Sequence, residues 1–299
     1  MSFGGSFQAA EPRGCVSYRE QFDPKVDDAL KAEFMDELHV MRCVRTVVPP
    51  RCYRECPPTF IATWRSFCSS NDRSLSHPNI VAFKGACTRP PRLCFVMELC
   101  GPSIFSILHG GGKRKPNLPQ RVQWARQIAE AMAYLHGKSP AVIHRDLKSH
   151  NVLIGREGSA KLCDFGLVRQ RTTNAGTPNY MAPELLQSKP FSRKVDVFAF
   201  GMLLHEILTG KLPFHGWRPA TIVDEVPKGA RPDVPENEDV FPRELQALVR
   251  RCWDTDPNER PEFAEIVRIL QNWKPRRSAI VSATAKLGGG DALDSLLGK

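Results

Sequence analysis

The sequence predicts an α+β fold, and three kinds of apolar pattern indicate it. Two short apolar runs, 151–154 and 160–163, are separated by the turn-forming residues 155–159, which is typical of a β-hairpin. A continuous apolar run at 93–99 is broken at 100–103 and predicts a buried strand. Helices are predicted where apolar residues recur every three or four positions or fill a long run, at 121–136, 192–210 and 263–270.

The composition is that of an ordinary globular chain. Its 299 residues suit one large or two modest domains, and 41% are hydrophobic and 25% charged. No run of about 18 apolar residues occurs, so no membrane span is expected. The first six residues lack the basic stretch and apolar core of a secretory signal, and we therefore expect a cytoplasmic protein.

Neither the ten cysteines nor the formal net charge of +10 predicts a further class of protein. Cys52 and Cys56 lie close together, but no second pair completes a zinc pattern, so we expect scattered reduced thiols. Much of the basic excess lies at 42–73 and 274–277. Because no nucleic-acid motif accompanies this charge, we expect no nucleic-acid partner, and a basic nucleic-acid binder is only an alternative.

Three short motifs follow one another in the middle of the chain. They are His-Arg-Asp at 144–146 with Asn151 five residues after the Asp, Asp-Phe-Gly at 164–166, and Ala-Pro-Glu at 182–184. Their order and spacing resemble the catalytic core of a protein kinase. The resemblance implies a two-lobed protein-kinase-like fold, with a small β-rich lobe and a larger helical lobe. The alternative, a plain hairpin with acidic ends, leaves the first and last motifs unexplained.

The same resemblance divides the chain. The small lobe is expected at 1–99, the large lobe at 100–273 and a disordered tail at 274–299. An irregular insertion is expected near 42–76, before the His-Pro-Asn-Ile-Val of 77–81 that opens a strand in similar kinases. The insertion is either a regulatory element or sequence wrongly included in a gene model.

The resemblance also assigns catalytic roles. Asp146 would orient or deprotonate a substrate hydroxyl, and Lys148 would stabilise the phosphoryl group in transfer. Asn151 and Asp164 offer the hard oxygen atoms that suit Mg²⁺. The predicted hairpin would bring these two residues together, because they stand at the outer ends of its strands. ATP and Mg²⁺ are the expected cofactors.

The nucleotide's adenine is expected where 93–99 joins the large lobe. By resemblance, Met97 is the gatekeeper, the backbones of Glu98 and Cys100 bond the adenine edge, and Leu153 closes the pocket from below. The alternative for Met97 and Leu153 is an ordinary place in the core.

The N-terminal residues match the family poorly. The segment 4–9 resembles the later part of a Gly-rich loop, so Gly5, Ser6 and Phe7 would lie near the phosphates, where backbone N–H groups bind best without side chains. Gln8 stands where the last Gly is expected. A flexible chain end is the alternative.

The next expected element is a strand whose Lys holds the ATP phosphates. The corresponding residues, 14–22, contain no Lys; Arg19 or Glu20 stands near that position, and an Arg is not equivalent to a Lys. The segment 31–41 has helical periodicity and resembles the regulatory helix of the small lobe, with Glu37 as its ion-pairing carboxylate. The alternative is that Glu37 is solvated.

Regulatory residues are expected around the segment that follows the hairpin. Thr172 and Thr173 are candidate phosphorylation sites, because the added charge would pair with Arg145; unmodified loop threonines are the alternative. Thr177 matches the position that holds the catalytic Asp and Lys in Ser/Thr kinases. Thr177 and Lys148 together favour Ser/Thr over Tyr specificity.

Two acidic residues need partners because burial is expected for both. Asp196 opens a helix that is apolar nearly all round, and by resemblance it bonds the backbone at 144–145. Glu184 would pair with Arg260, because a buried unpaired carboxylate is costly. His144 is expected to be a packed structural residue and not a base.

The chain most resembles the tyrosine-kinase-like group of Ser/Thr kinases. The first hypothesis is a Ser/Thr protein kinase domain that acts on a protein substrate in intracellular signalling, with activity impaired by the atypical small lobe. The second is a kinase-shaped binding module without turnover, because the strand Lys and a complete Gly-rich loop are missing.

Overall fold

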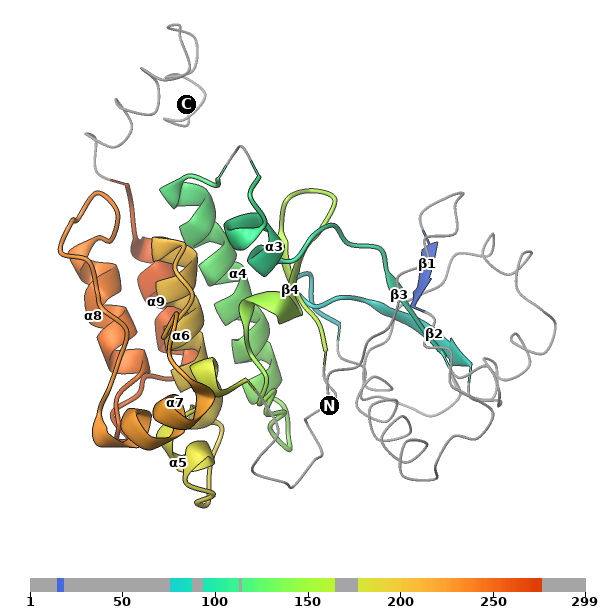
Figure 1. Ribbon diagram of the computed structural model, residues 1–299. Helices are drawn as coiled ribbons and strands as arrows, with labels where there is room; N and C mark the ends of the chain where they lie inside the picture. Colours follow the sequence, from blue (N-terminus) through green and yellow to red (C-terminus); the bar gives the residue numbers. More distant parts are fainter. Residues whose placement is uncertain (1–14, 19–75, 88–93, 113–114, 165–176, 276–299) are drawn as a thin grey trace, which may run out of the picture.

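The computed structural model describes residues 15–18, 76–87, 94–112, 115–164 and 177–275. Helices gather on one side, a three-stranded sheet lies on the other, and a short hairpin stands between them (Figure 1). The α+β class is confirmed, and the arrangement is consistent with the two lobes of a kinase.

Several predicted segments lie outside these ranges. They are the Gly-rich segment 4–9, the helix 31–41, all of the insertion near 42–76 except Ser76, and most of the tail 274–299. The lobe boundaries of 1–99 and 100–273 stay predictions.

The larger sheet contains β1 (Cys15–Tyr18), β2 (Phe83–Cys87) and β3 (Cys94–Glu98). The strand order is β1-β3-β2 and both pairs are antiparallel. β3 confirms the strand predicted at 93–99. β1 forms inside 14–22, the segment where a strand was expected and its Lys was missing.

The segment His77–Val81 is a turn, so the prediction that it opens a strand was wrong. The N–H of Ile80 donates to the carbonyl of His77 at 3.1 Å, which closes the turn, and β2 begins only at Phe83. The N–H of Val81 donates to the carbonyl of Leu162 at 2.9 Å. This segment therefore bonds to the smaller sheet before the chain enters β2.

The smaller sheet is the predicted hairpin, which the structure confirms. β4 (Val152–Ile154) and β5 (Ala160–Leu162) pair antiparallel, with Val152 opposite Leu162. The turn between them contains Gly158 at φ 76°, a backbone conformation that glycine adopts without strain. A single 3₁₀ turn, η2 (Ser149–Asn151), leads into β4.

The three predicted helices are confirmed as α4 (Leu118–His136), α6 (Lys194–Thr209) and α9 (Phe263–Asn272). α4 begins three residues before the predicted start, because the side chain of Asn117 caps it by accepting the N–H of Gln120 at 3.0 Å. α6 ends at Gly210 as predicted, where φ is 69°.

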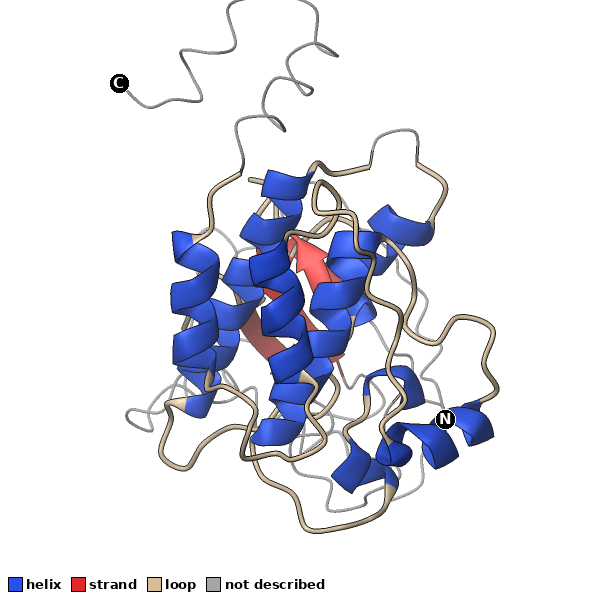
Figure 2. Ribbon diagram, turned by 90° about the vertical axis from the view of Figure 1, so that its left-hand side faces the viewer, coloured by secondary structure: helices blue, strands red, loops and turns tan. Residues whose placement is uncertain are grey.

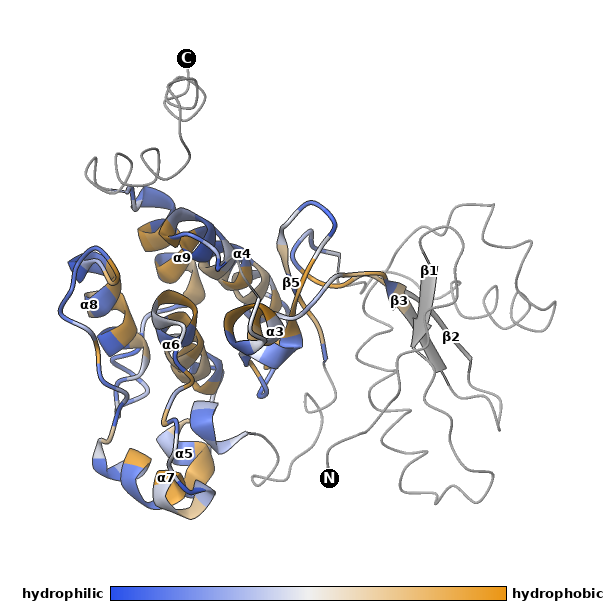
Figure 3. Ribbon diagram, turned by 45° about the horizontal axis from the view of Figure 1, so that its top comes forward, coloured by the Kyte–Doolittle hydropathy of each residue, from blue (hydrophilic) through white to orange (hydrophobic). Residues whose placement is uncertain are grey.

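The core surrounds α6, in which every residue from 195 to 208 is buried. Turned by 90°, the helices stand as roughly parallel rods with strands behind them (Figure 2). Hydrophobic sides gather between α4, α6 and α9 (Figure 3). None of the helices in the described part of the chain is long and apolar enough to cross a bilayer.

The remaining helical segments are short and follow the loops around α6. The segments are α3 (Ile104–His109), α5 (Pro183–Leu186), α7 (Pro219–Glu225), α8 (Arg243–Cys252), η3 (Pro178–Tyr180) and η4 (Val226–Lys228).

Glycine permits a close approach between α6 and α8. A Cβ on Gly201 of α6 would lie only 2.9 Å from the Cβ of Cys252.

Candidate active site

The loop that carries the His-Arg-Asp motif is held from below by Asp196 of α6. Its carboxylate accepts the backbone N–H groups of His144 and Arg145, each at 2.8 Å, and contacts Nε2 of His136 at 2.8 Å. Asp196 is fully buried, so these bonds replace the water that it lost on folding. The predicted contact is confirmed, and it holds Arg145 at φ 68°, a conformation that costs a non-glycine residue about 1–3 kcal/mol.

His144 is a structural residue, as predicted. It is fully buried; its Nε2 lies 3.2 Å from the carbonyl of Cys163, and its Nδ1 accepts the N–H of Asp146 at 3.3 Å. Because Nδ1 accepts a hydrogen bond and Nε2 faces a carbonyl, the proton belongs on Nε2. The ring joins the loop to the end of β5.

Asp146 lies at the centre of a polar cluster. Its Oδ2 is 2.7 Å from Nζ of Lys148 and accepts from Nδ2 of Asn151 at 2.9 Å. Nζ of Lys148 also donates to Oγ1 of Thr177 at 3.1 Å. The structure thus brings together four residues that the sequence singled out, from the loop, the 3₁₀ turn and the segment before η3.

The hairpin brings Asn151 next to Asp164. The N–H of Cys163 donates to the carbonyl of Asn151 at 2.9 Å, and Asp164 follows directly, exposed at the end of β5 with φ 64°. Both amide hydrogens of Asn151 are used by Asp146, since Nδ2 also donates to the Asp146 carbonyl at 2.9 Å. The amide oxygen of Asn151 is therefore the atom left for a cation, and with the Asp164 carboxylate it makes a donor set that fits Mg²⁺.

The chain after β3 runs beside β4. The N–H of Gly101 donates to the carbonyl of Ile154 at 2.7 Å, and Ser103 forms a bridge with Leu153. Leu153 therefore lies next to the segment that begins at Cys100, as the predicted adenine pocket requires. Contact of these residues with a nucleotide stays a prediction.

Met97 and Glu98 stand at the end of β3, and both are partly buried. Met97 packs against the core, as its alternative reading also expects. The carboxylate of Glu98 accepts the N–H of Ala82 at 3.2 Å and lies 3.0 Å from Nζ of Lys161. Its side chain thus holds the end of β3 to β5 through Lys161.

Glu184 and Arg260 form the predicted ion pair. The guanidinium donates to both carboxylate oxygens, at 2.6 and 2.9 Å, and it also bonds the carbonyls of Asp254 and Lys194 at 2.8 and 3.0 Å. Arg260 is 1% exposed, so its charge depends on these partners. This prediction is confirmed.

A third buried carboxylate, that of Glu206, was missed by the sequence analysis. Its side chain is 0% exposed and accepts from Oγ of Ser149 at 2.7 Å and from the hydroxyl of Tyr180 at 2.6 Å. Nε2 of His109 lies 2.9 Å from the same carboxylate. Burial and the Glu206 carboxylate raise the pKa of Tyr180, which stays protonated and donates. The only sequence signal was one acid in an otherwise apolar stretch.

Two cysteines lie close to the candidate site. Burial, and then the nearby Glu98, raise the pKa of the Cys100 thiol to about 11. Burial, and then Asp164, raise the pKa of Cys163. Both side chains are therefore thiols, not thiolates, at neutral pH.

Some predicted residues lie beyond the described part of the chain. They are Gly5, Ser6, Phe7, Glu37, Thr172 and Thr173. Arg145, the expected partner of Thr172 and Thr173 after phosphorylation, is 8% exposed, and its guanidinium lies 4.9 Å from the centre of the Phe191 ring.

The fold and this loop together define a protein kinase domain. Comparison with known families agrees, because the model described as protein tyrosine and serine/threonine kinase matches residues 69–270. The chain belongs to this family.

Individual relatives are protein kinases by name, and two of the three described here are named serine/threonine kinases. The chain is 41% identical over 209 residues to serine/threonine-protein kinase STY46 of Arabidopsis thaliana, which covers 67% of this chain and 35% of the relative. It is 39% identical over 209 residues to CTR1 of the same plant, covering 67% of this chain and 25% of the relative. It is 39% identical over 210 residues to mitogen-activated protein kinase kinase kinase 7 of Bos taurus, covering 66% and 35%. The chain thus spans about a third or less of these relatives.

Proposed function

We propose that this chain transfers the γ-phosphoryl group of ATP to Ser and Thr hydroxyls of proteins, with Mg²⁺ as the metal. The observation that carries the proposal is the contact of Lys148 with both Asp146 (2.7 Å) and Thr177 (3.1 Å). It sets a carboxylate and an ammonium group side by side, next to an Asn and an Asp that suit a cation. This is the set of charges that phosphoryl transfer needs.

In the proposed reaction, the Asp146 carboxylate orients the substrate hydroxyl and takes its proton. The hydroxyl oxygen bonds to the γ-phosphorus as the bond from that phosphorus to the β-γ bridging oxygen breaks, which leaves ADP. The Lys148 ammonium group offsets the negative charge on the transferred phosphoryl group. Asp146 is held for this work by the amide of Asn151, which donates to its carboxylate, and by the ring of His144, which accepts its backbone N–H.

Asn151 and Asp164 would hold Mg²⁺, which when bound neutralises the phosphate charge. Met97, Leu153 and the backbones of Glu98 and Cys100 would enclose the adenine. Gly5, Ser6 and Phe7 would cover the phosphates. Support for this arrangement comes from the donor chemistry of Asn151 and Asp164 and from the position of Leu153 beside the chain that follows β3.

The hydroxyl-bearing Thr177 supports Ser/Thr specificity, as do the names of the two Arabidopsis thaliana relatives. The proposed substrate is a protein, and the proposed role is in intracellular signalling. We place the chain in the cytoplasm. A phosphate group on Thr172 or Thr173 would pair with Arg145 and order the activation segment, residues 164–184. Glu37 would be the ion-pairing acid of the regulatory helix at 31–41.

A kinase-shaped binding module without turnover is the second candidate. The observation in its favour is β1, which forms the expected strand with the sequence Cys-Val-Ser-Tyr and no Lys. Retention of Asp146, Lys148, Asn151 and Asp164 favours the enzyme, because binding alone does not need all four.

Radiolabelled ATP tests the proposal on the whole chain, with and without Asp146→Asn. The substitution keeps the size of the side chain but removes the carboxylate, so we expect transfer to a protein substrate to fall about 10²- to 10⁴-fold. Asp224→Asn is the matched control, because Asp224 is exposed on α7 and takes part in none of the hydrogen bonds described for the polar cluster. ATP binding is measured on the same samples.

Equal transfer by both variants overturns the assignment of Asp146. ATP binding by the unaltered chain without any transfer selects the binding module. In that case, recovery of transfer by Glu20→Lys would assign the loss to the missing Lys of the small lobe.

A further inference from the structure

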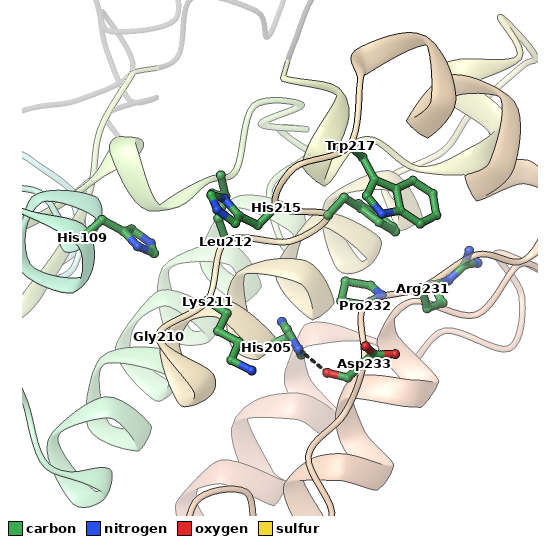
Figure 4. A pocket seen from close by; sticks show the side chains of 11 residues that line it. His109, His205, Gly210, Lys211, Leu212, His215, Trp217, Arg231, Pro232 and Asp233 are labelled. Atoms are coloured by element: carbon green, nitrogen blue, oxygen red, sulfur yellow. Dashed lines mark hydrogen bonds between the residues drawn. The ribbon is translucent and has the colours of Figure 1, made fainter.

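A cavity of about 590 Å³ lies beyond the C-terminal end of α6 (Figure 4). Its walls are His109 at the end of α3, residues from the loop 210–217 after α6, and the segment 231–233. His205 of α6 closes one side and contacts the carbonyl of Asp233 at 2.9 Å. The volume is in the range of ligand sites, and the reaction proposed above does not use this cavity.

Hydrogen bonds connect the cavity walls to the active site by short paths. His109 contacts Glu206 at 2.9 Å, and Glu206 accepts from Ser149, three residues after Asp146, at 2.7 Å. On the other wall, Nδ2 of Asn179 donates to the carbonyl of Pro213 at 2.7 Å. The Glu206 carboxylate therefore joins one wall of the cavity to the loop that carries Asp146.

One wall presents aromatic surface. The rings of Phe214 and Trp217 are 5.2 Å apart, and Trp217 is 44% exposed. The backbone is turned there by positive φ angles of 54° at Phe214 and 85° at Gly216. Such a conformation is costly at Phe214, and strained residues cluster at binding sites. An exposed Trp on a rigid turn is also the side chain that most often anchors a partner.

The lining carries more positive than negative charge. Lys211 and His215 are exposed and form no ion pair with other residues in the described ranges. Burial lowers the pKa of Arg231 to about 10, so it stays protonated at neutral pH, although its donors are used by carbonyls such as that of Trp253. Asp233 is the single carboxylate among the residues that line the cavity.

We infer that this cavity binds a segment of the protein substrate that carries an Asp or Glu beside a large apolar residue. The carboxylate meets Lys211, and the apolar side chain packs on Trp217. This inference rests on the proposed function, because it assigns part of the substrate of the same site. It predicts that substrate selection depends on residues outside the phosphorylated Ser or Thr.

Binding of a series of peptides to the whole chain tests this inference. A Glu-Leu pair is moved stepwise along a fluorescein-labelled Thr peptide, and binding is measured by fluorescence anisotropy without ATP. The best peptide is compared with its Lys-Leu and Glu-Ala counterparts. We expect both changes to weaken binding about 3- to 10-fold, which is typical of losing one charge contact or one apolar contact.

Two variants locate the site. Lys211→Glu should weaken binding of the Glu-Leu peptide and improve binding of the Lys-Leu peptide, and Trp217→Ala should remove the preference for Leu. The control Arg268→Glu, exposed on α9, makes the same change in net charge and should alter neither. Thermal unfolding checks that each variant is folded.

Equal binding of all three peptides, or equal effects of Lys211→Glu and Arg268→Glu, overturns the inference. Selective binding without phosphoryl transfer leaves the cavity assigned and overturns the enzyme instead. Phosphoryl transfer without selective peptide binding supports the enzyme and overturns the assignment of the cavity.

Discussion

At the scale of single residues, Lys148 is shared between two groups. Its ammonium group contacts the Asp146 carboxylate and donates to the Thr177 hydroxyl, so it joins these two side chains. Thr177 comes from the segment just before η3, so in the proposed reaction its position would set the direction in which Lys148 faces the phosphoryl group. The hydroxyl of Thr177 is thus a positioning group for Lys148.

Replacing Thr177 by Val removes the hydroxyl and keeps the shape of the side chain. We expect kcat for a Thr peptide to fall about tenfold, since one hydrogen bond to a charged group contributes about 1.5 kcal/mol. Steady-state kinetics measures it. Thr177→Ser keeps the hydroxyl and should restore most of the rate, so an equally slow Ser variant would refute the role of the bond.

Residue roles were predictable where a charge had to be buried. The sequence predicted Asp196 under 144–145 and Glu184 with Arg260, and the structure confirms both pairs. Glu206 escaped because its partners come from three segments far apart in the chain. Periodicity reports which face of a helix is buried, but not which polar side chains reach it from elsewhere.

At the scale of elements, α4 shows how a cap sets a boundary. The helix starts at Leu118 because the Asn117 side chain satisfies the N–H of Gln120, which has no partner within the helix. The apolar periodicity alone predicted a start at 121, because Pro119, Gln120 and Arg121 precede the apolar pattern that begins at Val122. Asn117 followed by Pro119 was the signal of the true start.

Asn117→Ala should lower the free energy of unfolding by about 1 kcal/mol, because it removes this capping bond. Urea denaturation followed by circular dichroism measures the change. Asn117→Asp keeps an acceptor at the same place and should cost much less. An Ala variant as stable as the original chain would show that the cap contributes nothing.

Other elements were predictable to different degrees. The hairpin followed from two apolar runs and a glycine turn, and the end of α6 followed from Gly210, because both signals are local. The turn at His77–Val81 did not, since its backbone bonds to Leu162, far along the sequence. Resemblance suggested a strand there, and tertiary contacts decided against it.

At the scale of the whole molecule, Glu184 and Arg260 join parts of the chain 76 residues apart. The pair connects α5, which follows the activation segment, to the loop before α9. Arg260 also bonds three backbone carbonyls, those of Asp254, Lys194 and Thr255, so it holds several loops at once. Loss of the carboxylate would leave a buried cation without its counter-charge.

Glu184→Ala should therefore lower the free energy of unfolding by about 3–5 kcal/mol. Chemical denaturation of the whole chain measures it. The control is Glu157→Ala, since Glu157 is exposed in the turn of the β4–β5 hairpin. Equal stability of the two variants would show that the pair is not a main support of the large lobe.

The burial of α6 has a mechanical consequence. Asp196 holds the loop at 144–145 and Glu206 holds it at Ser149, and ten residues of helix separate these anchors by about 15 Å. Both anchors belong to one stiff rod, so any tilt of that rod displaces the two ends of the loop together. In the proposed reaction, the spacing of Asp146 and Lys148 within this loop would therefore be set by α6.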